Sequence, residues 1–257
     1  FYVHTPFCEQ LCNFCLCSKE ITQDYSKVKN YLYKYLSKEF DMLEKHLDLN
    51  KINFNFKEIY LGGGSPTYYK KEEFKYLLNR LKKLVDFKNL GDFTIEVDPR
   101  RVTEETLLFY HEMGVNRLSF GIQDFDLGVQ EEINRIQPPE LLDKLLTENV
   151  RKLFPVINFD LLIGLPRQSQ KTIENTINEV ARLRPSQIQT MYVHYKPGTR
   201  KYMIKMVRNE PMLDFFDRKA VFERARNLLL EGGYTRAGFE SYSLPGDPLT
   251  KSMTEKK

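Results

Sequence analysis

The chain has 257 residues, of which 41% are hydrophobic and 13% aromatic, so it can bury a core without disulfide staples. Its 39 Lys and Arg residues against 35 Asp and Glu residues leave a net charge of only +4, which excludes the basic footprint of a nucleic-acid binder. No apolar stretch approaches the ~20 residues of a membrane span, and no signal peptide is seen. We therefore expect a soluble, cytoplasmic protein that contacts neither membrane nor nucleic acid.

All four cysteines, Cys8, Cys12, Cys15 and Cys17, lie within ten positions of one another. Disulfide frameworks are typical of small secreted domains that lack a core, and this chain is long enough to have one. Structural zinc usually takes ligand pairs that are separated by a longer loop. An iron-sulfur cluster often takes its thiolates from one short irregular segment, so the spacing favours this third use.

Six short apolar runs, rich in β-branched and aromatic residues, each predict a buried strand. They occupy residues 1–7, 57–63, 93–98, 117–123, 157–164 and 187–195. Amphipathic stretches of helical period lie between them, for example at 25–47, 71–85, 103–114 and 169–183. Such alternation implies a parallel sheet with crossover helices. We expect an open partial (β/α)6 TIM-like barrel, with an open doubly wound sheet as the alternative.

One domain is expected over residues 1–235, since no repeat, low-complexity segment or linker divides them. Residues 236–257 are expected to begin a C-terminal segment that is truncated or disordered. Phe1 already lies within the first predicted strand, so the sequence looks like a piece of a longer protein.

Polar residues fall where the predicted strands end, and in α/β folds of this kind the chemistry collects at the carboxyl ends of the strands. In chain order these are Cys8, the turn GGGSPT at 62–67, Glu96 with Asp98, Gln123, Asp160 and His194. Glycines in such a turn let backbone groups approach a ligand closely, although a plain tight turn has the same composition.

The motif C-x-x-x-C-x-x-C, followed about 50 residues later by GGGSPT, resembles the radical S-adenosylmethionine superfamily. Six segments also resemble, in order and spacing, the oxygen-independent coproporphyrinogen III oxidase group. They are YVHTPFCEQLCNFCLCSKEIT, YLGGGSPTYY, IEVDPR, RLSFGIQDF, INRIQ and DLLIGLP.

This resemblance implies that Cys8, Cys12 and Cys15 hold three irons of a 4Fe-4S cluster. The amino and carboxylate groups of S-adenosylmethionine would chelate the fourth iron. An electron from the cluster would then split the sulfonium to give methionine and a 5'-deoxyadenosyl radical. A tetrapyrrole substrate and a flavodoxin- or ferredoxin-type electron donor follow from the same resemblance.

The resemblance also assigns residues to the cofactor. Gly63 and Gly64, with Ser65 of the same turn, would meet its methionyl amino group. Arg135 would pair with its carboxylate through the planar guanidinium fork.

Three further residues, Glu96, Gln123 and Asp160, would take its amino and ribose hydroxyl groups as hydrogen-bond partners. Buried polar residues satisfied inside the barrel are the alternative, above all for Gln123.

Three more residues are candidates for the reaction itself. Cys17 resembles a fourth cysteine that in the oxidases is required for activity but does not hold the cluster. The alternatives are an inert thiol and a spare cluster ligand. Tyr2 resembles a tyrosine that in the family packs near the cofactors. A tyrosine packed in the core is the alternative. His194 ends a strand and could touch substrate or a second cofactor.

The resemblance weakens after residue 190. There KPGTRKY looks more like relatives that act as heme chaperones, and Glu240 and Ser241 replace the acid and the histidine of a D-H-F segment. Three functions therefore stay open: oxidative decarboxylation of a porphyrinogen propionate, methyl or methylene transfer with a second S-adenosylmethionine, and heme trafficking. The motifs favour the first.

Overall fold

The main sheet of the computed structural model, which describes residues 1–51 and 55–255, contains six parallel strands. In spatial order they are β1 (Tyr2–Thr5), β4 (Glu58–Gly63), β5 (Asp92–Val97), β6 (Arg117–Gln123), β7 (Val156–Ile163) and β8 (Gln187–Tyr192). Beyond β8 the sheet continues with β10 (Ser241–Ser243) and β9 (Thr235–Arg236), which are antiparallel. The six predicted strands are thus confirmed, in chain order and with parallel pairing.

Helices connect the strands on the outer side of the sheet. The α-helices are α1 (Tyr25–Asn30), α2 (Ser37–Asn50), α3 (Lys71–Leu81), α4 (Glu104–Glu112), α5 (Leu127–Glu132), α6 (Glu140–Leu145), α7 (Glu148–Leu153), α8 (Gln170–Leu183), α9 (Phe215–Glu231) and α10 (Pro248–Thr254). Short 3-10 turns are η2 (Pro66–Tyr68), η3 (Phe87–Asn89), η4 (Pro99–Arg101) and η5 (Lys201–Val207). The long helix expected at 25–47 is present but passes through a π-helical stretch, η1 (Tyr31–Leu36).

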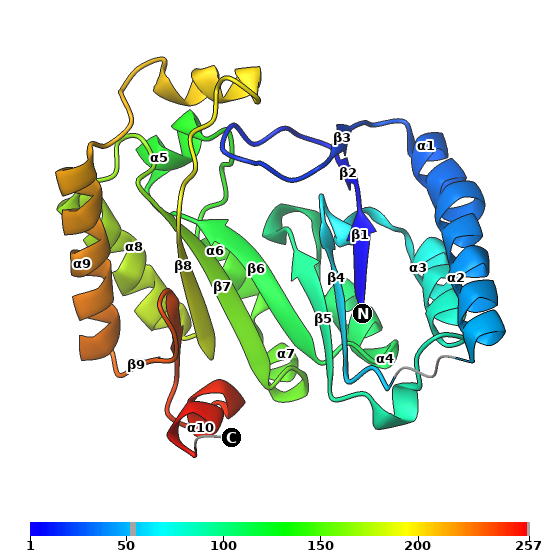
Figure 1. Ribbon diagram of the computed structural model, residues 1–257. Coiled ribbons are helices and arrows are strands. Elements are labelled where there is room, and N and C mark those ends of the chain that lie inside the picture. Colours follow the sequence, from blue (N-terminus) through cyan, green and yellow to red (C-terminus); the bar gives the residue numbers. More distant parts are fainter. Residues whose placement is uncertain (52–54, 256–257) are drawn as a thin grey trace.

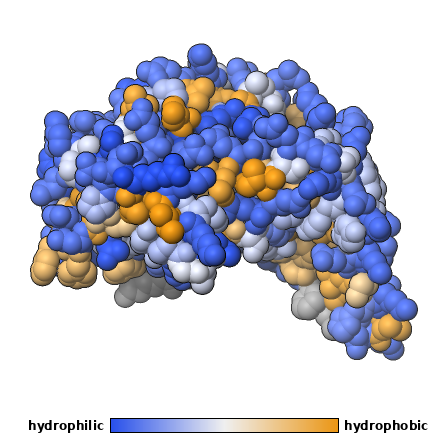
Figure 2. Space-filling view, turned by 90° about the horizontal axis from the view of Figure 1, so that it is seen from above, coloured by the Kyte–Doolittle hydropathy of each residue, from blue (hydrophilic) through white to orange (hydrophobic). Residues whose placement is uncertain are grey.

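The sheet is curved and open, as expected for a partial barrel (Figure 1). Helices α1 to α3 flank one end of it, α8 and α9 flank the other, and α6 and α7 lie behind it. Seen from above, the molecule is an arch that is hollowed on one side (Figure 2). Among the described residues, no helix has both the length and the apolar character needed to cross a bilayer.

The core lies between the sheet and its helices. Ile59, Phe93 and Phe120 on the strands are fully buried, as are Ile173 and Val180 on α8. Helix α8 begins at a capping box in which Ser169 and Thr172 exchange hydrogen bonds, and this satisfies free backbone donors of its first turn. Buried faces of this kind fix the register of the strands, and with it the position of every residue at their carboxyl ends.

The C-terminal residues depart from the expectation. The sequence places the end of the barrel domain near residue 235, whereas β10 pairs with β8 inside the main sheet. Residues 236–255 are folded rather than disordered, because Tyr242 of β10 is fully buried and Ser243 shares a buried hydrogen bond with Thr250 of α10.

Candidate active site

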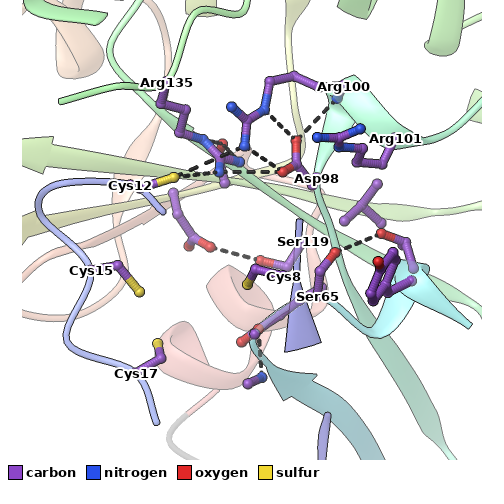
Figure 3. Close-up of a pocket in the computed structure, with 18 of the residues that line it drawn as sticks. Cys8, Cys12, Cys15, Cys17, Ser65, Asp98, Arg100, Arg101, Ser119 and Arg135 are labelled. Carbon is purple, nitrogen blue, oxygen red and sulfur yellow. Dashed lines mark hydrogen bonds and ion pairs between the residues drawn. The ribbon is translucent and has the colours of Figure 1, made fainter. Parts of the chain in front are cut away.

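A cavity of about 1180 Å³ opens at the carboxyl ends of the parallel strands. Of the predicted site residues, its lining includes Cys8, Cys12, Cys15, Cys17, Gly63, Gly64, Ser65, Glu96, Gln123, Arg135, Asp160 and His194. The cysteine loop forms one wall, and the ends of β4, β5, β6 and β7 form the floor (Figure 3). The fold therefore brings together residues that are up to 186 positions apart, from Cys8 to His194.

Tyr2 is the predicted site residue that does not line this cavity. Its side chain is exposed, and its hydroxyl lies 3.0 Å from Nδ1 of His4, two residues along the same face of β1. Its ring stacks on Tyr60, the residue paired with it on β4. The hydroxyl of Tyr60 donates to Glu96 at 3.0 Å, and partial burial, with the negative charges of Glu96 and Cys17, raises the pKa of Tyr2, so both tyrosines lie beside the site.

The cysteine loop is closed at its base by a small parallel sheet. Strand β2 (Phe7–Cys8) pairs with β3 (Glu20–Ile21), and the amide of Thr22 donates to the carbonyl of Cys8 at 3.0 Å. Between these strands the chain has little regular structure; one turn forms where the amide of Cys15 donates to Cys12 O at 3.2 Å. The loop leaves and rejoins the fold at one point, so its thiols stay on one wall.

The tip of the loop is bound to the end of α5. The amide of Asn13 donates to Ile133 O at 2.9 Å, and its side chain donates to Glu132 O at 2.9 Å. In return Asn134, which has a left-handed φ of 56°, donates from its side chain to Leu11 O at 2.7 Å. Asparagine tolerates that conformation better than most residues, which suits it to this position.

Two guanidinium groups face the Cys12 sulfur. Nη1 of Arg135 lies 3.6 Å from it and Nη2 of Arg100 lies 4.0 Å away. Asp98 sits between the arginines: Nη2 of Arg100 donates to its Oδ2 at 2.7 Å, and Nη1 of Arg135 is 3.5 Å from the same oxygen (Figure 3). Two guanidinium groups and one carboxylate thus leave a net positive charge beside the Cys12 sulfur.

The other thiols differ in how readily they ionise. Burial, together with the negative charges of Cys15 and Cys12, raises the pKa of Cys8 to about 12. A hydrogen bond from Cys17, aided by the Lys19 ammonium, lowers the pKa of Cys15 to about 6 despite its burial. Thiolates crowded in this way repel one another, and bound metal cations would remove that repulsion.

The donor set suits soft metal ions, because thiolates select iron-sulfur clusters, zinc and copper(I). Within residues 1–51 and 55–255, no three His, Cys, Asp or Glu side chains converge into a site for a single metal ion. Cys8, Cys12 and Cys15 instead stand apart along the wall of the cavity.

The glycine turn packs directly on the strand that leads into Cys8. Gly63 has a φ of 117°, and a Cβ there would lie 2.7 Å from the His4 ring; at Gly64 it would lie 2.7 Å from Phe7 O. The amides of Gly64 and Ser65 donate to Thr5 O and Phe7 O, at 2.7 and 2.8 Å. No larger side chain fits without moving backbone, so these glycines fix the approach of β4 to the cysteine loop.

Buried polar groups line the floor of the cavity. Glu96 accepts hydrogen bonds from Gly63 N at 3.0 Å and from Tyr60, and burial raises its pKa. Asp160 accepts from Ser119 at 3.0 Å, and burial raises its pKa too.

Gln123 is the unsatisfied member of this floor. It has a left-handed φ of 70°, and its Oε1 is buried without a hydrogen-bond partner in the described part of the chain. A buried acceptor left unpaired is costly, so its position on the lining fits a ligand that donates to it.

Arg135 is held by the protein more completely than the sequence suggests. Its Nε donates to Gly121 O and to Gln137 Oε1, both at 3.1 Å, and its Nη2 donates to Gly121 O at 2.7 Å. Only Nη1, which faces Cys12 and Asp98, points away from these acceptors.

Three residues of the site are not identified by the sequence analysis: Arg100, Lys19 and Tyr202. A signal existed for Arg100, since two arginines follow Asp98 at a strand end in VDPRR. Asp98 is expected at this strand end, and the structure adds its ion pairs with Arg100 and Arg135. Tyr202 gave no such signal, because its hydroxyl reaches the cysteine loop from a segment 187 positions away.

The fold and the cavity together define an α/β partial-barrel protein with a thiol-rich loop at the carboxyl ends of its strands. The family model described as the Radical SAM superfamily matches residues 2–180. The chain belongs to the radical S-adenosylmethionine superfamily, which implies a 4Fe-4S cluster and S-adenosylmethionine as cofactors.

Relatives place the chain near one branch of that superfamily. It is 32% identical over 259 residues to the oxygen-independent coproporphyrinogen III oxidase of Pseudomonas aeruginosa, and 30% identical over 257 residues to that of Escherichia coli. These matches cover 99% of this chain but 55% and 54% of the relatives, so the chain spans about half of their length. The solved structure of the Escherichia coli coproporphyrinogen III oxidase matches with a TM-score of 0.87 at 29% identity, over 99% of this chain and 57% of that one.

The ion group at Cys12 predicts a pH dependence of stability. Burial raises the pKa of Asp98, but Arg135 and Arg100 outweigh it and lower the pKa from 3.8 to about 2. A depressed carboxyl pKa stabilises the fold above the unfolded pKa, and that stability is lost as pH falls from about 4 through about 2. Asp98→Asn should therefore lower the free energy of unfolding of the metal-free protein by roughly 2 kcal/mol at pH 7, and by progressively less below pH ~4.

Urea unfolding at a series of pH values measures this difference. The exposed Asp48 is the matched control, and Asp48→Asn should stay within ~0.5 kcal/mol of the parent at every pH. A deficit in Asp98→Asn that is the same at pH 2 and pH 7 would contradict the role given to its charge.

Proposed function

We propose that the chain is the radical S-adenosylmethionine part of an oxidoreductase of the coproporphyrinogen III dehydrogenase type. The observation that carries the proposal is the single cavity lined by Cys8, Cys12, Cys15 and the polar ends of four strands. The similarity to coproporphyrinogen III oxidases along nearly the whole chain also supports the proposal. The substrate, the electron donor and the activity of the whole protein are part of the proposal.

In this proposal Cys8, Cys12 and Cys15 hold the 4Fe-4S cluster, and one iron stays open for S-adenosylmethionine. When bound, the two cofactors supply an electron for sulfonium cleavage and a carbon radical able to remove a hydrogen atom. The protein's own contribution is to orient the thiolates and to keep water and oxygen away. Arg100 and Arg135 lie close enough to Cys12 to offset part of the cluster's negative charge.

The polar floor would hold the cofactor's hydrogen-bonding groups. Gln123 Oε1 is a buried acceptor that lacks a partner among the described residues, so an amino or hydroxyl donor would satisfy it. The carboxyl groups of Glu96 and Asp160 are suited to the ribose hydroxyls. For the cofactor carboxylate, Nη1 of Arg135 is the available donor, and the backbone of the Gly63 and Gly64 turn would meet the amino group.

The size and rim of the cavity support a large anionic substrate. Pockets for small ligands commonly hold about 300–1,000 Å³, so about 1180 Å³ leaves room for a substrate side chain or a second S-adenosylmethionine beside the first. Lys70 and Arg101 line it, and their charge complements propionate carboxylates.

Hydrogen-atom removal from a propionate would give a substrate radical that loses carbon dioxide and passes one further electron to a separate electron acceptor, leaving a vinyl group. Cys17 and His194 line the cavity, and in this proposal they contact the substrate. A flavodoxin or ferredoxin would supply the reducing electron, and a cytoplasmic location remains a prediction.

A transferase with a second S-adenosylmethionine is the other candidate. It is favoured by Glu240, which lines the cavity where the oxidase pattern has a different acid segment. The volume of the cavity is compatible with both functions, so the products of the reaction have to distinguish them. A heme chaperone, the third reading of the sequence, would give neither set of products.

Cluster binding should depend on three of the four cysteines. Anaerobically reconstituted protein should carry about four irons and absorb broadly in the visible range. Cys12→Ala should lose both properties, since it removes one of three ligands, whereas Cys17→Ala should keep them. Iron analysis and absorption spectra measure this; an intact cluster in Cys12→Ala, or its loss in Cys17→Ala, would contradict the ligand assignment.

Product analysis tests the reaction type. With dithionite, S-adenosylmethionine and coproporphyrinogen III under anaerobic conditions, the full-length protein should release methionine, 5'-deoxyadenosine and carbon dioxide. Mass spectrometry of the mixture, with the Cys12→Ala protein as a blank, measures each product. S-adenosylhomocysteine that accumulates with turnover would support the transferase instead, and heme binding without any turnover would support the chaperone.

A further inference from the structure

The segment after β8 crosses over the cysteine loop. In Figure 1 the yellow chain of η5 (Lys201–Val207) lies next to the dark-blue loop that joins β2 to β3. The hydroxyl of Tyr202 in η5 donates to the carbonyl of Cys15. Two regions separated by almost the whole barrel sequence thus meet at the thiols.

Lys19 completes this contact from the loop side. Its ammonium donates to Cys15 O at 3.0 Å and to Cys17 O at 3.3 Å, and it lies 3.0 Å from the hydroxyl of Tyr202. The same ammonium stands 4.9 Å from the centre of the Tyr202 ring, within the range of a cation–π contact. The carbonyl of Cys15 therefore accepts from two donors, which fixes the peptide plane next to its thiol.

An apolar cluster anchors η5 to the barrel. Met203 and Met206 are fully buried against residues that include Leu165, and Phe14 and Leu16 of the cysteine loop pack on the same cluster. Since methionines adapt to irregular gaps, they hold η5 in place without regular secondary structure around it. Tyr202 is thus set on a fixed support and can hold the loop.

The contact also places a positive charge where the loop needs one. Thiolates on one short loop repel one another, and a loop of little regular structure opens easily unless other groups bind its backbone. Lys19 supplies the charge, and Tyr202 keeps the ammonium beside the two carbonyls. Lys19 also lines the cavity, so this pair lies at the site itself.

We propose that Lys19 and Tyr202 form a latch that holds the backbone of the cysteine loop and so slows the release of its iron-sulfur cluster. Both are positioning residues, since they act on the loop through its carbonyl groups. The inference rests on the proposed function, because it needs a cluster on Cys8, Cys12 and Cys15. It adds that the segment after β8, where the resemblance to the oxidases weakens, is part of the cluster site.

Cluster release to an iron chelator under anaerobic conditions tests the latch in reconstituted full-length protein. Tyr202→Phe removes the hydrogen bond donated to Cys15 O and the one accepted from the Lys19 ammonium, and should speed release by about five-fold or more. Lys19→Met removes three charge-assisted hydrogen bonds, to Cys15 O, Cys17 O and the Tyr202 hydroxyl, and should speed it by about ten-fold or more. Lys19→Arg keeps the charge and several donors, and should restore most of the retention.

Tyr195→Phe is the matched control, because Tyr195 packs on the same apolar cluster while its hydroxyl has no hydrogen bond within the described residues. The electron paramagnetic resonance spectrum of the reduced cluster is the second measurement. It should change in Tyr202→Phe and Lys19→Met and stay unchanged in Tyr195→Phe, since a general loosening of the fold would not alter it selectively.

Equal release rates and spectra in the parent, Tyr202→Phe and Lys19→Met would overturn the latch alone. The same would follow if Tyr195→Phe released its cluster as fast as Tyr202→Phe. Failure of the parent protein to take up a cluster would overturn the proposed function, and the latch with it, so the two failures are distinguishable.

Discussion

The cysteine loop has almost no regular structure, so its shape depends on hydrogen bonds with groups outside it. Asn134 binds the carbonyl of Leu11, and Tyr202 binds that of Cys15, while Asn13 ties the loop back to the end of α5. The β2–β3 pair closes the base. Because these contacts come from separate parts of the barrel, the thiols are positioned only when the fold is complete.

The second requirement is a balance of charge beside Cys12, and the carboxylate of Asp98 provides it. Two arginines beside one thiol would repel each other, and the carboxylate between them offsets that repulsion while leaving net positive charge near Cys12. The interactions are short and largely buried, so salt screens them weakly. The strand end that supplies Asp98 also supplies Glu96, so one segment of β5 serves both the thiol side and the floor of the cavity.

The strands and most site residues could be predicted because short segments encode them. Apolar runs in the sequence predict the buried strands. Because the carboxyl ends of parallel strands meet at one edge of the sheet, Glu96, Gln123 and Asp160 are expected to lie together. The contact of Lys19 with Tyr202 could not be predicted, since it depends on how an irregular segment packs. Side-chain alternation on β1 places Tyr2 on the same face as His4, and its position near the cofactors stays a prediction.

The central claim is that the three thiols leave one iron open for S-adenosylmethionine in this cavity. Electron paramagnetic resonance of the reduced, reconstituted protein, recorded with and without S-adenosylmethionine, tests it most directly. Ligation of the open iron should change the spectrum of the cluster, in the parent protein and in Cys17→Ala alike. A spectrum that is identical with and without saturating S-adenosylmethionine would contradict the account.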